Sequence, residues 1–366
     1  MTDWGCFPGE YSMMQRRGGL KSAVSVGATL VLVGVANPAV PAAVVSSAKS
    51  TTAAAARAAA PVAWFVPPDP IFYHRSLKCT GTSPYMALFA PGAPWRQAAA
   101  HIRVLETNFL WVADGPRGDL AREFDYLKRH GIALGLGGGV LTCRGLTGKV
   151  EGFAGRRVLR QVPRIARRVR RAGETVRYIG MDEPVFYGSI YSGRLARHWT
   201  PAHVAANATK TLRALSSAFP GLKVVDIEPL GGPPRQVALE IRRYKSAIEA
   251  FRQDGMPVTS FRTDVSWWAL PPGALAALRK MLRSEHVTFG VICDGSGHTD
   301  AAWVRSAEIN MARVRAAVGN PDVVVFQSWM RHPAQFLPEN AAYSFTHLID
   351  WYFSTWQANH REEGHK

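Results

Sequence analysis

The chain has 366 residues, of which 47% are hydrophobic, and a formal net charge of +17. This length and apolar content are enough for a sizeable buried core, so a wholly disordered protein is excluded. The four cysteines form no C-x-x-C pair and no His/Cys metal spacing, and we expect neither a metal site nor a cofactor.

The N-terminal segment has the composition of an export signal. A basic flank ends at Lys21, the apolar run of residues 23–36 follows, and small residues extend to Ala42. The run is shorter than the roughly 18 apolar residues of a membrane-spanning helix. We therefore predict a secretory signal peptide over residues 1–42, with an uncleaved anchor as the alternative. A bacterial protein that is secreted or periplasmic is expected, without stable membrane insertion after cleavage.

Two further segments precede the periodic part of the chain. Residues 43–60, nearly all Ala, Ser and Thr, predict a flexible linker, and the Pro-rich residues 61–84 predict an N-terminal strap. The signal pattern begins only after Met13 and Met14, so either methionine is an alternative start.

Most of the positive charge belongs to the mature part of the chain. Residues 1–60 carry +3, which leaves +14, and much of this lies in one stretch of arginines. A solvated helix face is the simplest interpretation, with attraction to anionic polymers of the cell envelope as an alternative. No aromatic residue interrupts the stretch, so we expect no nucleic-acid partner. The arginines are Arg156, Arg157, Arg160, Arg164, Arg167, Arg168, Arg170 and Arg171.

Three cysteines follow the predicted signal. Cys79 and Cys143 lie in loop-like sequence, and export favours oxidation, so we predict a disulfide between them. Cys293 lies inside an apolar strand pattern and is expected in the core.

From Tyr85 onward, short β-type runs alternate with amphipathic helix patterns. The runs predict eight strands: Tyr85 to Phe89, Ile102 to Glu106, Ile132 to Leu136, Arg177 to Met181, Lys223 to Ile227, Val258 to Thr263, Val287 to Cys293 and Val323 to Gln327. The segment Val62 to Pro67 is a candidate extra strand.

Eight helix patterns accompany these strands: Pro94 to Ala100, Asp119 to His130, Arg157 to Ala172, Pro201 to Phe219, Arg235 to Gln253, Pro272 to Arg283, Asp300 to Val318 and Tyr343 to Trp356. Thr200 is predicted to cap the helix that begins at Pro201.

Eight such units predict an α/β fold, a single (β/α)8 TIM barrel over residues 85–366 with an N-terminal extension. An open doubly wound sheet alternates in the same way and is the alternative architecture.

Acidic residues end several of the predicted strands. In a barrel of parallel strands the carboxyl ends share one face, where active sites of this fold lie. A single strand-end acid is about as often a helix cap or a loop ion pair, but the number of acids here favours a site. The candidates are Glu106, Asp182, Glu183, Glu228, Asp264 and Asp294.

Paired carboxyl groups suit glycoside hydrolysis. One group must stay protonated to donate to the leaving oxygen, and the other must stay ionised to attack carbon or to activate water. Asp182 and Glu183 are adjacent, and neighbouring residues of a strand point to opposite sides. We interpret Glu183 as the general acid and Asp294 or Glu228 as the nucleophile or base.

Aromatic residues follow the same strands, and rings bind the apolar faces of sugars. Trp268 follows the sixth predicted strand and Trp329 the eighth. The predicted substrate-binding residues are Asp182, Asp264, Glu106, Tyr187, Trp268, Gln327 and Trp329.

The sequence Asp182-Glu183-Pro184 resembles the Asn-Glu-Pro that ends the fourth strand of clan A glycoside hydrolases, and Ser328-Trp329 resembles the tryptophan that ends their eighth strand. The resemblance implies that Glu183 is the acid/base residue and that Asp182 touches the substrate. Asp replaces the family's Asn, and Asp294 stands where the family has its nucleophilic Glu.

The function predicted from the sequence is an exported glycoside hydrolase acting on an oligo- or polysaccharide. A non-catalytic barrel that binds envelope glycans is the alternative, followed by a metal-dependent hydrolase. The glycine-rich residues 135–139 lack the spacing of a dinucleotide-binding loop.

Overall fold

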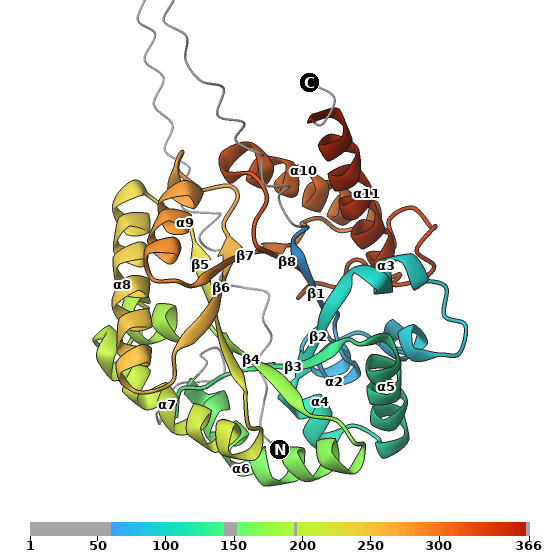
Figure 1. Cartoon of the computed structure of the whole chain (residues 1–366), viewed down its shortest axis with the longest axis horizontal. Helices are drawn as coiled ribbons and strands as arrows, with labels where there is room; N and C mark the ends of the chain where they lie inside the picture. The colour runs from blue at the N-terminus through green and yellow to red at the C-terminus, as the bar shows by residue number, and fades with distance from the viewer. Residues whose placement is uncertain (1–59, 143–151, 194–195, 364–366) are drawn as a thin grey trace, which may run out of the picture. The chain divides into compact units, whose positions relative to one another are not determined.

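The computed structural model describes residues 60–142, 152–193 and 196–363. Eight parallel strands close into a barrel, because β1 pairs with β8 as well as with β2. Helices surround the barrel on its outside (Figure 1). This arrangement confirms the predicted (β/α)8 fold. The strands are β1 (Val62–Val66), β2 (Ile102–Asn108), β3 (Ala133–Gly138), β4 (Val176–Asp182), β5 (Lys223–Leu230), β6 (Val258–Val265), β7 (Thr288–Cys293) and β8 (Val323–Gln327).

The prediction of a first strand at Tyr85–Phe89 is wrong. Residues Pro84–Phe89 form the 3₁₀ helix η1, which begins with a proline and is capped by the Ser83 side chain. A short apolar run fits a buried helix as well as a strand, and the proline at its start favours the helix here. The first strand is instead β1, in the segment that the sequence offers as an extra strand.

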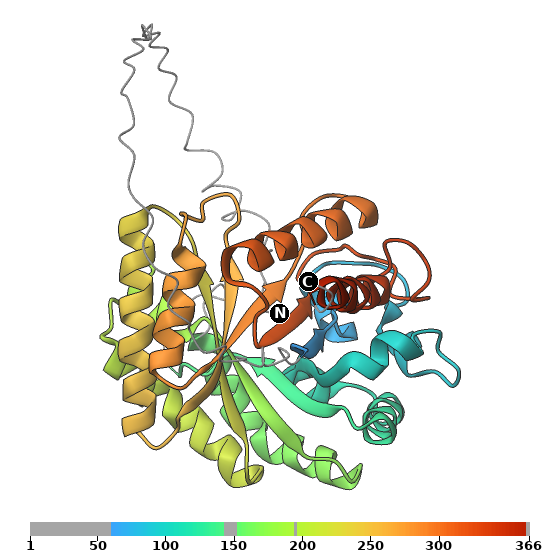
Figure 2. The same cartoon turned by 45° about the horizontal axis from the view of Figure 1, so that its top comes forward.

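The eight predicted helices are all present. The ends of α10 are as predicted, and the other seven helices have one or both ends shifted: α3 (Arg96–His101), α5 (Arg117–His130), α6 (Gly152–Arg171), α7 (Pro201–Ala218), α8 (Pro234–Gln253), α9 (Ala274–Ser284), α10 (Asp300–Val318) and α11 (Phe345–Glu363). The sequence did not indicate three short additions: α2 (Pro70–Arg75), α4 (Phe109–Asp114) and the π-helix η2 (Phe186–Ile190). As predicted, Thr200 caps α7, accepting the N–H of His203. Figure 2 shows the long helices around the barrel wall.

Alternate residues of each strand face the inside of the barrel. An inner apolar cluster contains Trp64, Val104, Val225, Ile227, Ile292, Val323 and Val325. The intervening residues, such as Leu105, Val224, Phe261 and Val291, belong to the larger cluster between the strands and the helices. This alternation fixes the direction of every side chain farther along the same strand.

An ion pair fills the centre of the barrel. The guanidinium of Arg262 lies 3.5 Å from the ring centroid of Trp64, and its Nη1 is 2.8 Å from Oε2 of Glu106. Glycines on β3 and β4 make room for this pair. A Cβ atom at Gly137 would lie 2.6 Å from Glu106 Oε1, and one at Gly180 would lie 2.9 Å from it. The glycine-rich β3 therefore accommodates a buried carboxylate.

Several predictions lie outside the described residues. They are the signal peptide over residues 1–42, most of the predicted linker, and the disulfide, which requires Cys143. Within the described residues, no helix is both long and apolar enough to cross a bilayer.

Candidate functional site

Three aspartates face inward at the carboxyl ends of neighbouring parts of the barrel. Asp294 follows the inward Ile292 by two residues, and Asp264 follows the inward Arg262 by two residues. Asp182 follows Gly180 in the same way on β4. The pleat of the strands therefore places all three carboxyl groups at one mouth. We call this place the acidic mouth, defined by Asp182, Asp264 and Asp294 together with Glu183.

Water reaches the side chains of the acidic mouth. Asp182 is exposed, and Asp264, Asp294 and Glu183 are partly exposed. Protein nevertheless surrounds these groups closely enough that loss of hydration is the main influence on the pKa of each of them. Carboxyl groups with perturbed pKa values that solvent can still reach are candidates for a functional site.

Burial and mutual repulsion raise the pKa values of the carboxyl groups around the mouth. Burial and then the charge of Glu106 raise the pKa of Asp182 to about 6. Burial and then Asp182 raise the pKa of Asp264 to about 7. Burial and then Asp264 raise the pKa of Asp294 well above its usual range. Each group thus acts on the next one around the barrel, as expected of like charges in one cleft.

Glu183 has an unusual backbone conformation at the end of β4. Its φ is 52°, in the left-handed region that residues other than glycine rarely adopt. Its N–H donates to Ile227 O at 2.9 Å, and its own carbonyl accepts from the N–H of Tyr187 at 3.0 Å. Glu183 therefore ends the strand and begins the helical turn that leads into η2. Such strain is concentrated at functional sites.

The Glu183 side chain also belongs to the acidic mouth electrostatically. Burial, followed by the charges of Asp182 and Asp264, raises its pKa well above the usual range, and a hydrogen bond with Tyr187 partly opposes the rise. Glu183 therefore holds its proton more strongly than an ordinary glutamate does.

Glu228 does not face the mouth. It is fully buried, and its Oε1 and Oε2 accept the backbone N–H groups of Val185 at 2.6 Å and Phe186 at 2.8 Å. The sequence placed the end of the fifth strand at Ile227, whereas β5 extends to Leu230. Since Ile227 faces inward, Glu228 faces outward, towards the turn that follows Glu183.

Asp226 is a buried acid that the sequence analysis did not select. It lies on the outward face of β5 two residues before Glu228, and neither of its carboxyl oxygens has a hydrogen-bond partner. Burial raises its pKa well above the usual range. Burial and then the charge of Asp226 raise the pKa of Glu228 well above its usual range as well, and the backbone N–H groups of Val185 and Phe186 partly oppose the rise.

Glu106 also lies away from the surface of the mouth. The predicted second strand ended at Glu106, but β2 continues to Asn108, so Glu106 lies one inward position deeper. It is 2% exposed and is bound to Arg262. Its predicted contact with a substrate is replaced by a contact with the barrel interior.

The predicted aromatic residues and Gln327 differ in how far solvent reaches them. Trp268 is 58% exposed and Trp329 is 36% exposed, the two large rings that the described residues present most openly. Tyr187 is partly buried and packs against Phe186, with ring centroids 5.2 Å apart. Gln327 ends β8 at an inward position, and its buried Oε1 has no hydrogen-bond partner.

Two residues of the site were not predicted. The indole N–H of Trp267 points to Asp294 Oδ1 at 3.4 Å, next to the selected Trp268. Arg262 balances the charge of Glu106 beneath the mouth. The signal that could have identified Arg262 is its position between Ser260 and Asp264 on the same face of a predicted strand, since a charged residue in a strand interior is rarely buried without a partner.

Among the described residues, no group of three or more His, Cys, Asp or Glu side chains has the arrangement that holds a metal ion.

Comparisons with known proteins find a likeness of fold only. No family model matches the chain, and no curated protein matches it. A psychrophilic glycoside hydrolase family 10 endo-β-1,4-xylanase is 10% identical with a TM-score of 0.44, over 72% of this chain and 86% of that one. The carboxyl transferase domain of Rhizobium etli pyruvate carboxylase is 13% identical with a TM-score of 0.45, over 83% and 49%. D-psicose 3-epimerase is 13% identical with a TM-score of 0.39, over 70% and 99%.

Proposed function

We propose that the chain is an exported glycoside hydrolase that cleaves an oligo- or polysaccharide at the acidic mouth. The observation that supports this proposal is the difference in proton affinity among carboxyl groups that lie close enough to influence one another. The pKa of Asp182 is about 6, whereas burial and neighbouring charges hold that of Glu183 well above its usual range. The mouth therefore offers a carboxyl group that ionises readily beside one that holds its proton more strongly, the pairing that glycoside hydrolysis requires.

Glu183 is the proposed general acid. Its proton passes to the glycosidic oxygen as the bond from that oxygen to the anomeric carbon breaks. Two negative charges, on Asp182 and Asp264, hold the proton on Glu183 until the leaving oxygen accepts it.

Asp264 is the proposed base or nucleophile. It faces the mouth from β6, two strands away from Glu183, and its pKa of about 7 leaves a substantial ionised fraction at neutral pH. Asp294 keeps its proton more strongly and is assigned to hydrogen bonding with a sugar hydroxyl. Glu228, whose two oxygens already bind backbone N–H groups, is assigned to positioning the turn after Glu183.

The exposed rings of Trp268 and Trp329 supply the proposed sugar contacts. A ring that presents its face to solvent stacks on the apolar face of a pyranose.

The test measures the release of reducing ends from a panel of neutral, amino and acidic polysaccharides. The full chain should release reducing ends from at least one of them, and Glu183→Gln should abolish the release while unfolding at the same temperature. Asp125→Asn, in the exposed ion pair with Arg129 on α5, is the matched control and should keep full activity. Full activity of Glu183→Gln would refute the assignment.

A non-catalytic glycan-binding barrel is the second candidate, and the 58% exposure of Trp268 favours it. It predicts binding to a polysaccharide that Trp268→Ala weakens, with no reducing ends released from any member of the panel.

A further inference from the structure

Helix α6 carries a line of arginines on its outer face. Arg160, Arg164, Arg167 and Arg171 follow one another at intervals of four, three and four residues, and all four are exposed. Residues at these intervals lie on one side of a helix, over a length of roughly 16 Å at 1.5 Å per residue. We call these four residues the arginine line.

The inner arginines of the same helix serve the scaffold. Arg168 donates through Nη2 to the carbonyl oxygen of Gly115, and Arg157 Nη2 lies 3.8 Å from Asp114 Oδ2. These contacts hold α6 against the end of α4. Arg157 and Arg168 therefore have a structural role, and neither belongs to the arginine line.

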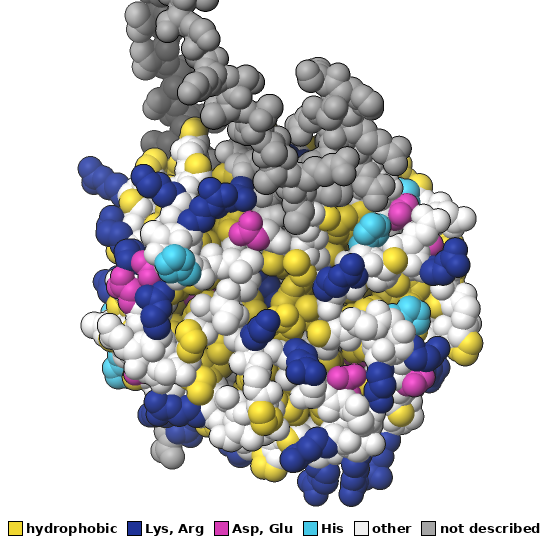
Figure 3. Space-filling view, in the orientation of Figure 1, with side chains coloured by type: hydrophobic (Ala, Val, Ile, Leu, Met, Phe, Trp, Pro, Cys, Tyr) yellow, Lys and Arg dark blue, Asp and Glu magenta, His cyan; other side chains and the backbone are white. Residues whose placement is uncertain are grey.

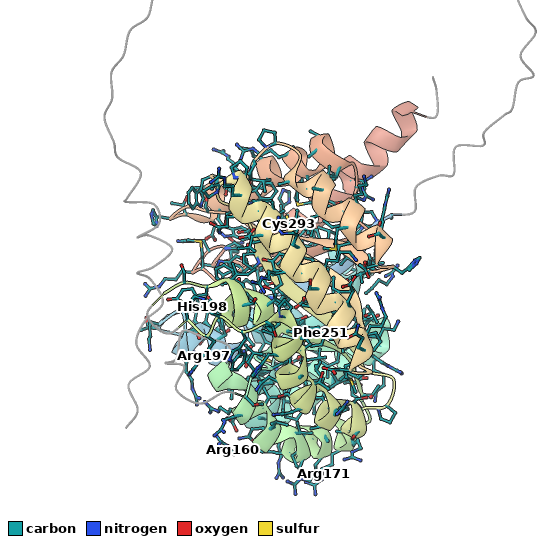
Figure 4. The ribbon with its side chains drawn as sticks, turned by 90° about the vertical axis from the view of Figure 1, so that its left-hand side faces the viewer. Arg160, Arg171, Arg197, His198, Phe251 and Cys293 are labelled. Atoms are coloured by element: carbon teal, nitrogen blue, oxygen red, sulfur yellow. The ribbon has the colours of Figure 1, made fainter. Side chains whose placement is uncertain are left out.

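The charge of the arginine line is almost unopposed. Arg164 Nη1 is 3.1 Å from Asp114 Oδ1, but Arg160, Arg167 and Arg171 have no acidic partner in the described part of the chain. Figure 3 shows Lys and Arg side chains gathered at the lower edge of the molecule, where Figure 1 places α6. In Figure 4, Arg160 and Arg171 extend away from the ribbon at this edge.

The arginine line runs along the outside of the barrel wall. Helix α6 connects β3 to β4, so it begins at the mouth end of the barrel and returns to the opposite end. Arg156 marks its beginning, where its Nε donates to Thr142 O, four residues beyond β3. A linear ligand on the arginine line would therefore lie along the wall, outside the acidic mouth.

We propose that the arginine line binds a linear anionic glycan that carries carboxylate or phosphate groups along its chain. Guanidinium groups bind both anions through paired N–H donors. A regular row of cations fits a polymer with repeated charges better than it fits a single small anion.

The residues around the arginine line favour a glycan over a single-stranded nucleic acid or a membrane surface. Single-stranded nucleic acids bind aromatic side chains between the cations, and none lies among these arginines. Membrane-surface helices bury an apolar face, but none of the large hydrophobic residues that are exposed in the described part of the chain lies on α6.

Binding of polygalacturonate to the full chain, at 50 and 200 mM salt, tests the proposal, with a poly(glycerol phosphate) chain to distinguish carboxylate from phosphate. Replacing Arg160, Arg167 and Arg171 together by Gln should weaken binding at least tenfold. Three ionic contacts predict a loss of roughly 20- to 40-fold in affinity between the two salt concentrations. The triple replacement by Lys keeps the charge but loses the paired donors, so its affinity should lie between those of the Gln variant and the unchanged chain.

The matched control removes three other exposed cations, Arg235, Arg242 and Lys280, on α8 and α9. It has the same net charge as the Gln variant and should bind within about twofold of the unchanged chain. Equal losses in both variants would show a net-charge effect and overturn the proposal. No binding of either polymer at 50 mM salt, or tighter binding of a single-stranded oligonucleotide of equal charge, would also overturn it. Glu183→Gln should bind normally, so this proposal and the proposed hydrolysis fail separately.

Discussion

The carboxylate of Glu228 accepts the backbone N–H of Val185 at 2.6 Å, two residues after Glu183. A second bond, from the N–H of Phe186 at 2.8 Å, fixes the same turn. Free N–H groups at the start of a helical segment favour a negative charge. Glu228 thus fixes the turn that directly follows Glu183. It does so from the outward face of β5, on the side away from the acidic mouth.

Glu228→Gln should reduce kcat by about 10- to 100-fold while KM changes little, because the general acid would lose its fixed position. A Gln side chain has one carbonyl acceptor, and its NH₂ group would face an N–H donor. The unfolding free energy should fall by about 1–3 kcal/mol. Steady-state kinetics and urea unfolding measure the two effects.

Glu123 offers a matched control for this substitution. It is also fully buried and accepts two bonds, from Tyr85 Oη at 2.9 Å and Trp111 Nε1 at 2.7 Å, but it lies on α5, outside the barrel. Glu123→Gln should lose stability and keep kcat. If both variants lose stability and neither loses kcat, Glu228 has no role in positioning Glu183.

The buried pair of Arg262 and Glu106 should show strong coupling in stability. Arg262→Met leaves Glu106 without its 2.8 Å partner, and we expect a loss of about 3–5 kcal/mol. Adding Glu106→Gln to Arg262→Met removes the unpaired charge and should recover part of this loss. Urea unfolding of the two single variants and the double variant measures the coupling. Additive losses would mean that the two groups do not interact.

The pH dependence of hydrolysis should respond to Asp182. Activity requires Asp264 ionised and Glu183 protonated, and the charge of Asp182 raises the pKa of both groups. Asp182→Asn removes that charge, so both limbs of the kcat/KM profile should move to lower pH. Asp125→Asn should leave the profile unchanged. A shift to higher pH after Asp182→Asn would contradict the proposed electrostatics.

Glu123 should also make stability depend on pH. Burial raises its pKa to about 8 from an ordinary 4.5. Between these values Glu123 keeps a proton in the folded chain that it has lost in the unfolded chain. The contribution of Glu123 to stability is therefore greatest below pH 4.5 and decreases as pH rises towards 8. Urea midpoints at pH 5 and pH 8 should therefore differ less for Glu123→Gln than for the unchanged chain. An equal difference would show that Glu123 is already ionised in the folded chain.

The sequence was sufficient for the barrel and for most of its elements, because long runs of alternating strand and helix patterns are strong signals. It was insufficient at Pro84–Phe89, where six residues are too few to distinguish a strand from a helical turn. Several of the predicted strands also ended too early. β5 extends three residues beyond the predicted Ile227, and β2 two residues beyond the predicted Glu106.

These small differences in length matter for the site, because the direction of a side chain alternates at each residue. An acid at a predicted strand end can face the acidic mouth, the surrounding helices or the interior of the barrel below the mouth. Asp264 and Asp294 face the mouth, Glu228 faces the turn after β4, and Glu106 lies beneath. Sequence patterns locate the acids, but only the pairing of the strands assigns each one its direction.

The requirement for Glu183 as a proton donor is tested most directly by changing the leaving group. Once the panel has identified the sugar, kcat/KM is measured for its glycoside with a poor leaving group and for its 2,4-dinitrophenyl glycoside, which departs without protonation. Glu183→Gln should lose about 10²–10⁴-fold on the first substrate and less than tenfold on the second. Equal losses on both substrates, or no loss on either, would contradict the assignment of Glu183 as the general acid.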